Sequence, residues 1–243
     1  MPLHLYEGLS GRLITTILKA KRFTGTQRLA VVKRRVTHLR HAWPDPLVRL
    51  RGASHCASPE VMPWSDEQPA RHDVPGLTSK AVLQKLAREV VAQAKRAYVS
   101  NGRKVPRCHA TRYQAPPWSR SRRVVIKVEG SAQGVHTRFI VTDMEQARPP
   151  GLYQHLSCAR GQAENESQDH KLYLPSERTA CHRFAAQQCR WLLHAAAYVL
   201  RETLRREVLR TTPWASAPMA TLPWRFLKRG ARVQERKDRM TIA

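Results

Sequence analysis

Apolar positions in this chain recur with helical spacing in three stretches. Over Thr26–Trp43 leucine and valine return every three or four positions, with arginine and lysine between them, which predicts an amphipathic helix ending before Pro44. A stronger stripe of the same period predicts a helix over Ser79–Val99. A third helix, long and rich in alanine, is expected over Cys181–Leu209 and should stop before Pro213.

Other stretches are short, β-branched and typical of strands. Leu13–Leu18 and Pro46–Gly52 each predict one strand. Arg122–Gly130 and Thr137–Met144 alternate along their length and are separated by a loop that contains Gly134. They therefore predict an antiparallel hairpin with one buried face.

The order of these elements indicates the fold class. A short helix is expected from Ser58, with Pro59 at its first helical position. The polar, Gly- and Pro-containing residues Asn101–Arg107 predict a loop. Together the segments read strand, helix, strand, helix, helix, hairpin, helix, helix. That order predicts an α/β chain with one sheet partly covered by helices, and residues 225–243 predict a basic tail that frays.

The net charge of the chain indicates which kind of molecule it binds. The chain of 243 residues is long enough for one medium domain with a real core, and 42% of its residues are hydrophobic. It carries 43 Lys and Arg against 18 Asp and Glu, a formal net charge of +25. Such an excess indicates a polyanionic partner, with nucleic acid favoured over an anionic membrane.

The sequence predicts neither a membrane protein nor a disulfide scaffold. The longest apolar run, Trp191–Leu200, is too short to span a bilayer and contains a histidine. The first residues lack the pattern of a signal peptide, so a cytoplasmic protein is expected. The five cysteines are scattered without a C-x-x-C pair, which argues against disulfides and a zinc ribbon.

One stretch, RGQAENESQDHK from Arg160 to Lys171, gathers acidic residues in this basic chain. If it is helical, Arg160, Glu164 and Lys171 fall within about 40° of one another, because each residue advances by about 100°. A carboxylate between two cations stays ionised and able to bind a metal, and the cations can contact phosphates. The alternative is an exposed helix with an ordinary i, i+4 ion pair.

The spacing R-x-x-x-E-x-x-x-x-x-x-K resembles the core of the Y-R-E-K signature in one branch of bacterial insertion-sequence transposases. Upstream, the segments PLHLYEGLSGRLITTIL, RLRGASHCASPEVM, RRVVIKVEG and RFIVTDM resemble that branch in the same order. Downstream, HKLYLPSERTACHRFAAQQCRWLLHAAAYVLRETLR resembles its continuation. The resemblance covers nearly the whole chain. It implies a DDE transposase domain with an RNase-H-like fold, an inserted β-hairpin and a long C-terminal helix.

The resemblance also implies a chemistry. In that family three carboxylates hold two divalent metal ions, Mg²⁺ or Mn²⁺, which activate water and then a 3′-hydroxyl for attack on a DNA phosphodiester. Glu164 matches the third catalytic carboxylate and would be the metal ligand. Arg160 and Lys171 match the signature residues that contact DNA.

Several positions of the family pattern are not matched. The family's second catalytic Asp lies in a segment resembling R-G-D-S-H-F, and here Ala53 takes its place within RGASHC. The first catalytic Asp belongs to a strand upstream of where the resemblance starts, so the chain is expected to be the C-terminal portion of a catalytic domain. Ser157 stands where the signature has tyrosine. Glu7 and Asp45 do not match either missing position.

The expected function is therefore that of a degenerate, N-terminally truncated transposase that binds DNA but is catalytically inactive alone. The alternative is a non-enzymatic basic nucleic-acid-binding protein, one that competes with an intact transposase for DNA or for subunits. Expected partners are DNA and a second copy of the chain or an intact transposase. Metal is not expected to bind productively, because one carboxylate cannot fix two ions.

Overall fold

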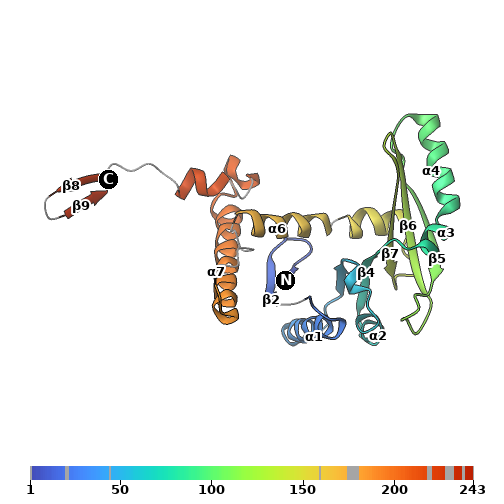
Figure 1. The fold of residues 1–243 in the computed structure, drawn as a ribbon, viewed down its shortest axis with the longest axis horizontal. Coiled ribbons are helices and arrows are strands. Elements are labelled where there is room, and N and C mark those ends of the chain that lie inside the picture. Colours follow the sequence, from blue (N-terminus) through green and yellow to red (C-terminus); the bar gives the residue numbers. More distant parts are fainter. Residues whose placement is uncertain are drawn as a thin grey trace. The chain divides into compact units, whose positions relative to one another are not determined.

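The structure is a computed structural model that describes residues 2–19, 22–43, 45–158, 160–173, 181–217, 221–227, 233–236 and 239–242. The chain forms two compact units (Figure 1). The central unit is Lys21–Gly161, and the terminal unit combines Met1–Ala20 with Gln162–Ala243. The mixed α/β class predicted from the sequence is confirmed.

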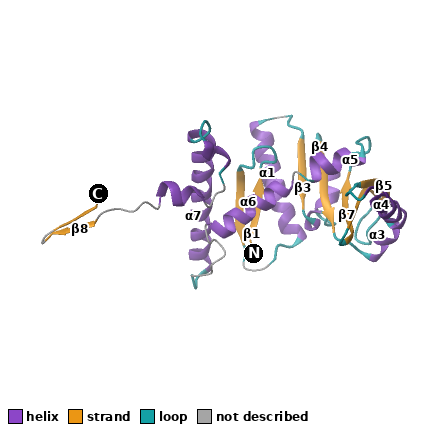
Figure 2. Ribbon diagram, turned by 90° about the horizontal axis from the view of Figure 1, so that it is seen from above, coloured by secondary structure: helices purple, strands orange, loops and turns teal. Residues whose placement is uncertain are grey.

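A five-stranded sheet is the framework of the central unit (strands in orange in Figure 2). Its strand order is β3-β4-β7-β6-β5, in which β3 and β4 are parallel and all other neighbours are antiparallel. The strands are β3 (Val48–Gly52), β4 (Arg71–Leu77), β7 (Gly134–Thr142), β6 (Arg122–Ser131) and β5 (Arg107–Tyr113).

The predicted hairpin is confirmed as β6 and β7, which pair from Arg123↔Thr142 to Ser131↔Gly134. Gly134 takes a positive φ of 116°, which a residue with a side chain rarely adopts and which lets the strand reverse. Val124, Ile126 and Val128 are all 0% exposed and pack in one cluster with α4 (Arg88–Asn101). Figure 1 shows α4 running along this hairpin.

The first predicted helix is confirmed as α1 (Gly25–Ala42). Thr24 caps it: its side chain accepts from the backbone N–H of Gln27, and the Gln27 side chain accepts from the backbone N–H of Thr24. This reciprocal capping box fixes the start of the helix. The helix expected from Ser58 begins later, as α2 (Val61–Asp66), because the Ser58 hydroxyl accepts from the Val61 N–H and acts as an ST cap before the helix.

The single helix expected over Ser79–Val99 is two helices, α3 (Ala81–Leu86) and α4, interrupted at Ala87. Leu83, Val90 and Ala94 are buried as the stripe predicts, but Val82 is 54% exposed. The interruption is a small one, since Ala87 keeps right-handed helical angles (φ −84°, ψ −8°). The spacing of apolar residues along the sequence cannot predict so small a break in the helix.

Two strands of this sheet were not predicted. β4 contains Arg71, His72, Asp73 and Pro75, a composition that disfavours a strand assignment. Its polar side chains are accommodated because Arg71 and Asp73 form a buried ion pair of 2.9 Å. Part of β5 falls in the stretch expected to be a loop, and it is an edge strand with exposed Arg107, His109 and Arg112.

In the terminal unit a hairpin packs with long helices. The unpredicted β1 (Pro2–Tyr6) pairs antiparallel with the predicted β2 (Leu13–Leu18). The stretch with the acidic residues is helical, as α6 (Arg160–Tyr173). The long C-terminal helix is confirmed as α7 (Phe184–Thr203), which continues in a π-helical turn. The side chain of Trp191 on α7 donates from its indole to the Thr16 hydroxyl at 2.6 Å.

Short elements complete the described chain. They are a helical turn at Pro149–Gly151 (α5), π-helical turns at Leu152–Ser157, Leu204–Val208 and Pro223–Leu227, and 3-10 turns at Ser54–Cys56 and Pro213–Ser216. Within the segment expected to be a basic tail, β8 (Val233–Arg236) and β9 (Arg239–Ile242) pair antiparallel. None of the described helices is long and apolar enough to cross a membrane.

Candidate functional site

Ala53, the residue at the second-acid position, directly follows β3 and is exposed. It adopts an extended conformation (φ −69°, ψ 174°) and precedes a 3-10 turn at Ser54–Cys56. The turn is tight, since a Cβ added to the preceding Gly52 would lie 2.3 Å from the Cys56 Sγ. The backbone thus holds this position at the carboxyl end of a parallel strand, a frequent place for functional side chains in α/β proteins.

Glu7 and Asp45, the two acids that match neither missing position, have different locations. Both carboxylate oxygens of Glu7 accept from the backbone N–H groups of Leu9 and Ser10, so this side chain stabilises the turn between β1 and β2. Asp45 precedes β3, so it lies at the opposite end of the strand from Ala53. Asp45 is therefore not placed to replace a carboxylate at residue 53, and the Glu7 carboxylate is engaged by its own turn.

Ser157, at the position of the signature tyrosine, ends the π-helical turn Leu152–Ser157 and is half-buried. The carbonyl of the adjacent Leu156 accepts from the guanidinium of Arg51 at 3.2 Å. This contact joins the segment just before α6 to the last part of β3, next to Ala53. Within the central unit, the second-acid strand and the signature segment are therefore linked.

On α6 the two glutamates of the sequence AENES point in different directions. Glu164 is exposed, whereas Glu166 is buried, with 6% of its surface accessible. Their separation of two residues, about 200° around a helix, accounts for the difference. Arg160 and Lys171 are within the same helix, but their side chains lie outside the described part of the structure. The expected contacts of these two side chains thus remain predictions.

The Glu166 carboxylate belongs to a polar network between α6 and α7. The hydroxyl of Tyr198 donates to it, and the Arg206 guanidinium lies 3.9 Å away. Arg206 also donates to Glu202 at 2.5 Å. Burial raises the pKa of Tyr198 well above its usual value, and the hydrogen bond to Glu166 raises it further. Tyr198 therefore stays a neutral donor, and Glu166 is held in a structural role.

His170, one turn further along α6, is fully buried in an aromatic cluster. Its ring lies 4.9 Å from that of His4, 5.2 Å from Trp191 and 5.6 Å from Tyr198, centroid to centroid. Burial lowers the pKa of His170 to about 4, because the charged imidazolium would lose its hydration. The imidazole is neutral near pH 7 and acts as a packing residue.

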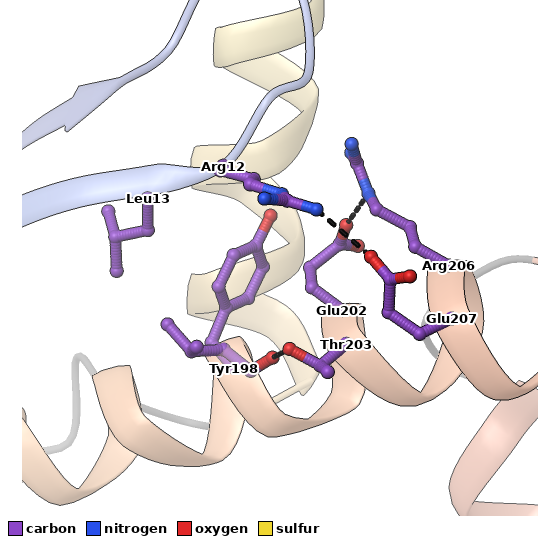
Figure 3. A pocket seen from close by; sticks show the side chains of 8 residues that line it. Arg12, Leu13, Tyr198, Glu202, Thr203, Arg206 and Glu207 are labelled. Atoms are coloured by element: carbon purple, nitrogen blue, oxygen red, sulfur yellow. Dashed lines mark hydrogen bonds and ion pairs between the residues drawn. The ribbon is translucent and has the colours of Figure 1, made fainter.

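A cavity of about 350 Å³ opens beside this network (Figure 3). Its lining residues are Arg12, Leu13, Tyr198, Val199, Glu202, Thr203, Arg206 and Glu207. The two arginines are paired, Arg12 with Glu207 at 3.0 Å and Arg206 with Glu202 at 2.5 Å. Because each cation already faces a carboxylate, the cavity does not select strongly for an anion or a cation.

A second polar cluster lies beneath α2 in the central unit and was not found from the sequence. Arg71 is buried, pairs with Asp73 and stacks on the ring of Trp64 at 4.4 Å. Ser65 donates to Asp73, whose backbone N–H in turn donates to Asp143 at 2.9 Å. Burial raises the pKa of Asp73 to about 6, against the opposing effect of the Arg71 guanidinium. The spacing of these residues carries no motif, so only the tertiary structure identifies them.

The donor set does not fit the two-metal arrangement that the resemblance implies. Among the residues that the structure describes, no three His, Cys, Asp or Glu side chains converge so as to hold a metal ion. Ala53 offers a methyl group, and Glu166 is engaged by Tyr198. Hard divalent cations need several oxygen ligands.

Exposed cations gather on α4. Arg88, Lys95 and Arg96 recur at spacings of seven and eight residues and are exposed, so they share one face of the helix. On α1, Arg40 donates to Gln68 and to the Pro69 carbonyl. The outer face of α4 thus presents exposed cations that are able to meet phosphates.

Comparison with known proteins supplies the family. The model of the family described as transposase DDE domain, group 1, matches residues 1–243. Comparisons with curated proteins and with solved structures gave no match. The mixed α/β fold, the inserted hairpin and the long C-terminal helix agree with the family match. The chain belongs to the transposase DDE domain family, group 1.

Proposed function

We propose that this chain is a DNA-binding transposase domain that does not cut DNA by itself. Membership of the family connects it with DNA transposition. The formal net charge of +25 and the exposed cations of α4 support contact with the phosphate backbone. Glu164 would be the remaining catalytic carboxylate, with Arg160 and Lys171 as DNA contacts.

The proposed loss of DNA cleavage rests on the presence of alanine at residue 53. It occupies an exposed position at the end of β3, where the family pattern has a metal-binding aspartate. A methyl group provides no lone pair, Asp45 lies at the other end of β3, and the Glu7 carboxylate accepts from the backbone of its own turn. Two-metal phosphoryl transfer needs both ions held about 4 Å apart to stabilise the attacking and leaving oxygens. One glutamate cannot meet this requirement.

Ala53 equally supports a second candidate function, that of a non-enzymatic nucleic-acid-binding protein. Such a protein would occupy DNA ends, or subunit interfaces, in place of an intact transposase. Both candidates predict DNA binding without cleavage by this chain. They differ in whether an intact transposase is inhibited when the chain is added, which is measured by titrating it into a strand-transfer reaction.

The test of the proposal is nicking of a duplex that carries a transposon end, with Mg²⁺ or Mn²⁺ present. The unmodified chain and the Ala53→Asp variant are both expected to leave the duplex intact, because a second carboxylate alone does not complete the site. Glu164→Ala is the matched control. Metal-dependent nicking by the unmodified chain that disappears in Glu164→Ala would overturn the proposal, whereas nicking that survives it indicates a contaminating nuclease.

A further inference from the structure

Two cysteines that are far apart in the sequence, Cys108 and Cys158, come together on one face of the central sheet. They are separated by 50 residues, and no C-x-x-C pair marks them, so sequence spacing does not reveal the relation. Both are free thiols, and both belong to the central unit. Cys108 is half-buried on the edge strand β5, whereas Cys158 is exposed and directly follows the π-helical turn Leu152–Ser157.

Strand pairing defines the face on which Cys108 lies. Cys108 is opposite Lys127 on β6, and Lys127 is opposite Arg138 on β7. Directly opposed residues of antiparallel strands project to the same face, so these three side chains form a row across the sheet. Tyr153 covers the row: its ring centroid lies 4.6 Å from the Lys127 Nζ, and its side chain is hydrogen-bonded to Arg138. Cys108 packs against the same apolar cluster that contains Tyr153.

Cys158 lies close to the same row. Its backbone N–H donates to the Tyr153 carbonyl at 2.8 Å. The hydrogen bond with Tyr153 raises the pKa of Arg138, and the charge of the nearby Cys158 raises it as well. Burial raises the pKa of the Cys108 thiol, Lys127 opposes this effect, and Cys158 reinforces it. The two thiols are therefore neighbours, one exposed and one half-buried.

We propose that Cys108 and Cys158 form a reversible disulfide when the folded chain is exposed to a peroxide. The exposed Cys158 thiol reacts first, because oxidants reach it directly: it reduces hydrogen peroxide, releases water and becomes a sulfenic acid. The Cys108 sulfur then attacks the Cys158 sulfur, the S–S bond forms, and a second water leaves with the Cys108 proton. Together the two thiols lose two electrons and two protons, which convert one hydrogen peroxide into two waters. Exchange with a small thiol such as glutathione restores both cysteines.

The disulfide would tether the entry to α6 to the edge of the sheet. Cys158 lies two residues before Arg160, the first residue of α6. The same turn is already joined to β3, because Arg51 donates to the Leu156 carbonyl at 3.2 Å. Oxidation would thus connect this segment to a second strand, β5, and close a loop of 50 residues. A cross-link that fits the native fold stabilises it, chiefly because it restricts the unfolded chain.

Peptide mapping of the unmodified full chain tests the disulfide. The chain is treated with hydrogen peroxide at low protein concentration, which suppresses links between copies, and is digested without reductant. Mass spectrometry should find the peptides that contain Cys108 and Cys158 joined, and dithiothreitol should separate them. The proposal is overturned if no such link forms, or if Cys158 pairs only with a different cysteine.

Single variants test the order of the two steps. Cys108→Ser should leave Cys158 as a sulfenic acid that dimedone labels, whereas Cys158→Ser should leave Cys108 reduced. Cys189→Ser is the matched control, because Cys189 is also exposed but lies on α7, and it should leave the link unchanged. Dimedone labelling of Cys108 in place of Cys158, or loss of the link in Cys189→Ser, would contradict the proposed chemistry.

Thermal unfolding distinguishes a link made in the folded chain from one made by trapping an unfolded form. Oxidation should raise the melting temperature by about 5–10 °C, because the bond closes a long loop. Reductant should reverse the rise, and peroxide-treated Cys108→Ser should not show it. An unchanged or lower melting temperature in the linked chain would mean that the bond does not fit the fold, and the proposal would be wrong.

Discussion

Glu164 and Glu166 lie two residues apart and have different environments. Helical periodicity alone separates them by about 200°, so the sequence could predict that one faces away from the other. It could not predict that the inner one meets Tyr198 and Arg206, because Tyr198 comes from α7 and Arg206 from the π-helical turn after it, both more than thirty residues further along the chain. The sequence likewise identified Ala53 only through its family pattern, while its exposure at a strand end required the structure.

Glu166→Ala is expected to lower the free energy of unfolding by about 1–3 kcal/mol, because Tyr198 would keep a buried hydroxyl without its acceptor. Glu164→Ala, at an exposed position, should change it by less than about 0.5 kcal/mol. Urea unfolding followed by circular dichroism measures both. If Glu164→Ala proved the more destabilising variant, the assignment of Glu166 as the structural glutamate would be wrong.

His170 should make stability depend on pH. Its pKa is lowered to about 4 in the folded chain, compared with about 6.5 when unfolded, so the unfolded chain binds more protons between these values. Stability contributed by the neutral imidazole is therefore present above pH 6.5 and lost as the pH falls toward 4. The expected loss between pH 7 and pH 5 is about 2 kcal/mol. His194, whose pKa burial also lowers, acts in the same direction.

Comparing the unmodified chain with a variant at residue 170 isolates the contribution of His170 to the pH dependence of stability. His170→Leu fills most of the same volume without a titratable group, so its stability should fall less between pH 7 and pH 5 than that of the unmodified chain. Thermal or urea unfolding at the two pH values provides the comparison. An equal fall in both proteins would assign the pH dependence to other groups.

At the scale of elements, periodic segments were predicted well and polar strands were not. α1, the β6–β7 hairpin and α7 have long apolar stripes, and each was found within a few residues of its bounds. β4 was missed because its alternation is carried by Arg71 and Asp73, whose burial depends on their ion pair and on α2 above them. Such compensation is a tertiary effect that local propensity does not contain.

The packing of α4 on β6 can be tested at Gly130. A Cβ added there would lie 2.9 Å from the Tyr98 Cβ and 3.0 Å from the Ala94 carbonyl oxygen, so helix and strand must separate. Gly130→Ala is expected to destabilise the chain by about 1–3 kcal/mol. Gly161→Ala is the matched control, because nothing lies within 4 Å and α6 is helical there, so it should stabilise by up to about 1 kcal/mol. Equal effects in calorimetry would contradict this account of α4 packing.

At the scale of the whole molecule, the excess of 43 basic over 18 acidic residues should appear as salt-sensitive DNA binding. Each phosphate that a cation neutralises releases counterions, so affinity should fall at least tenfold between about 50 and 200 mM salt.

The outer face of α4 should account for part of this salt dependence. Lys95→Gln with Arg96→Gln should reduce the slope of log affinity against log salt by about 2, across unrelated duplex sequences. Arg12→Gln with Arg112→Gln removes the same charge from cations already paired with Glu207 and Glu145, and should change the slope less. Fluorescence anisotropy with labelled duplexes measures both pairs. Equal slopes for the two double variants would mean that net charge, and not the face of α4, determines binding.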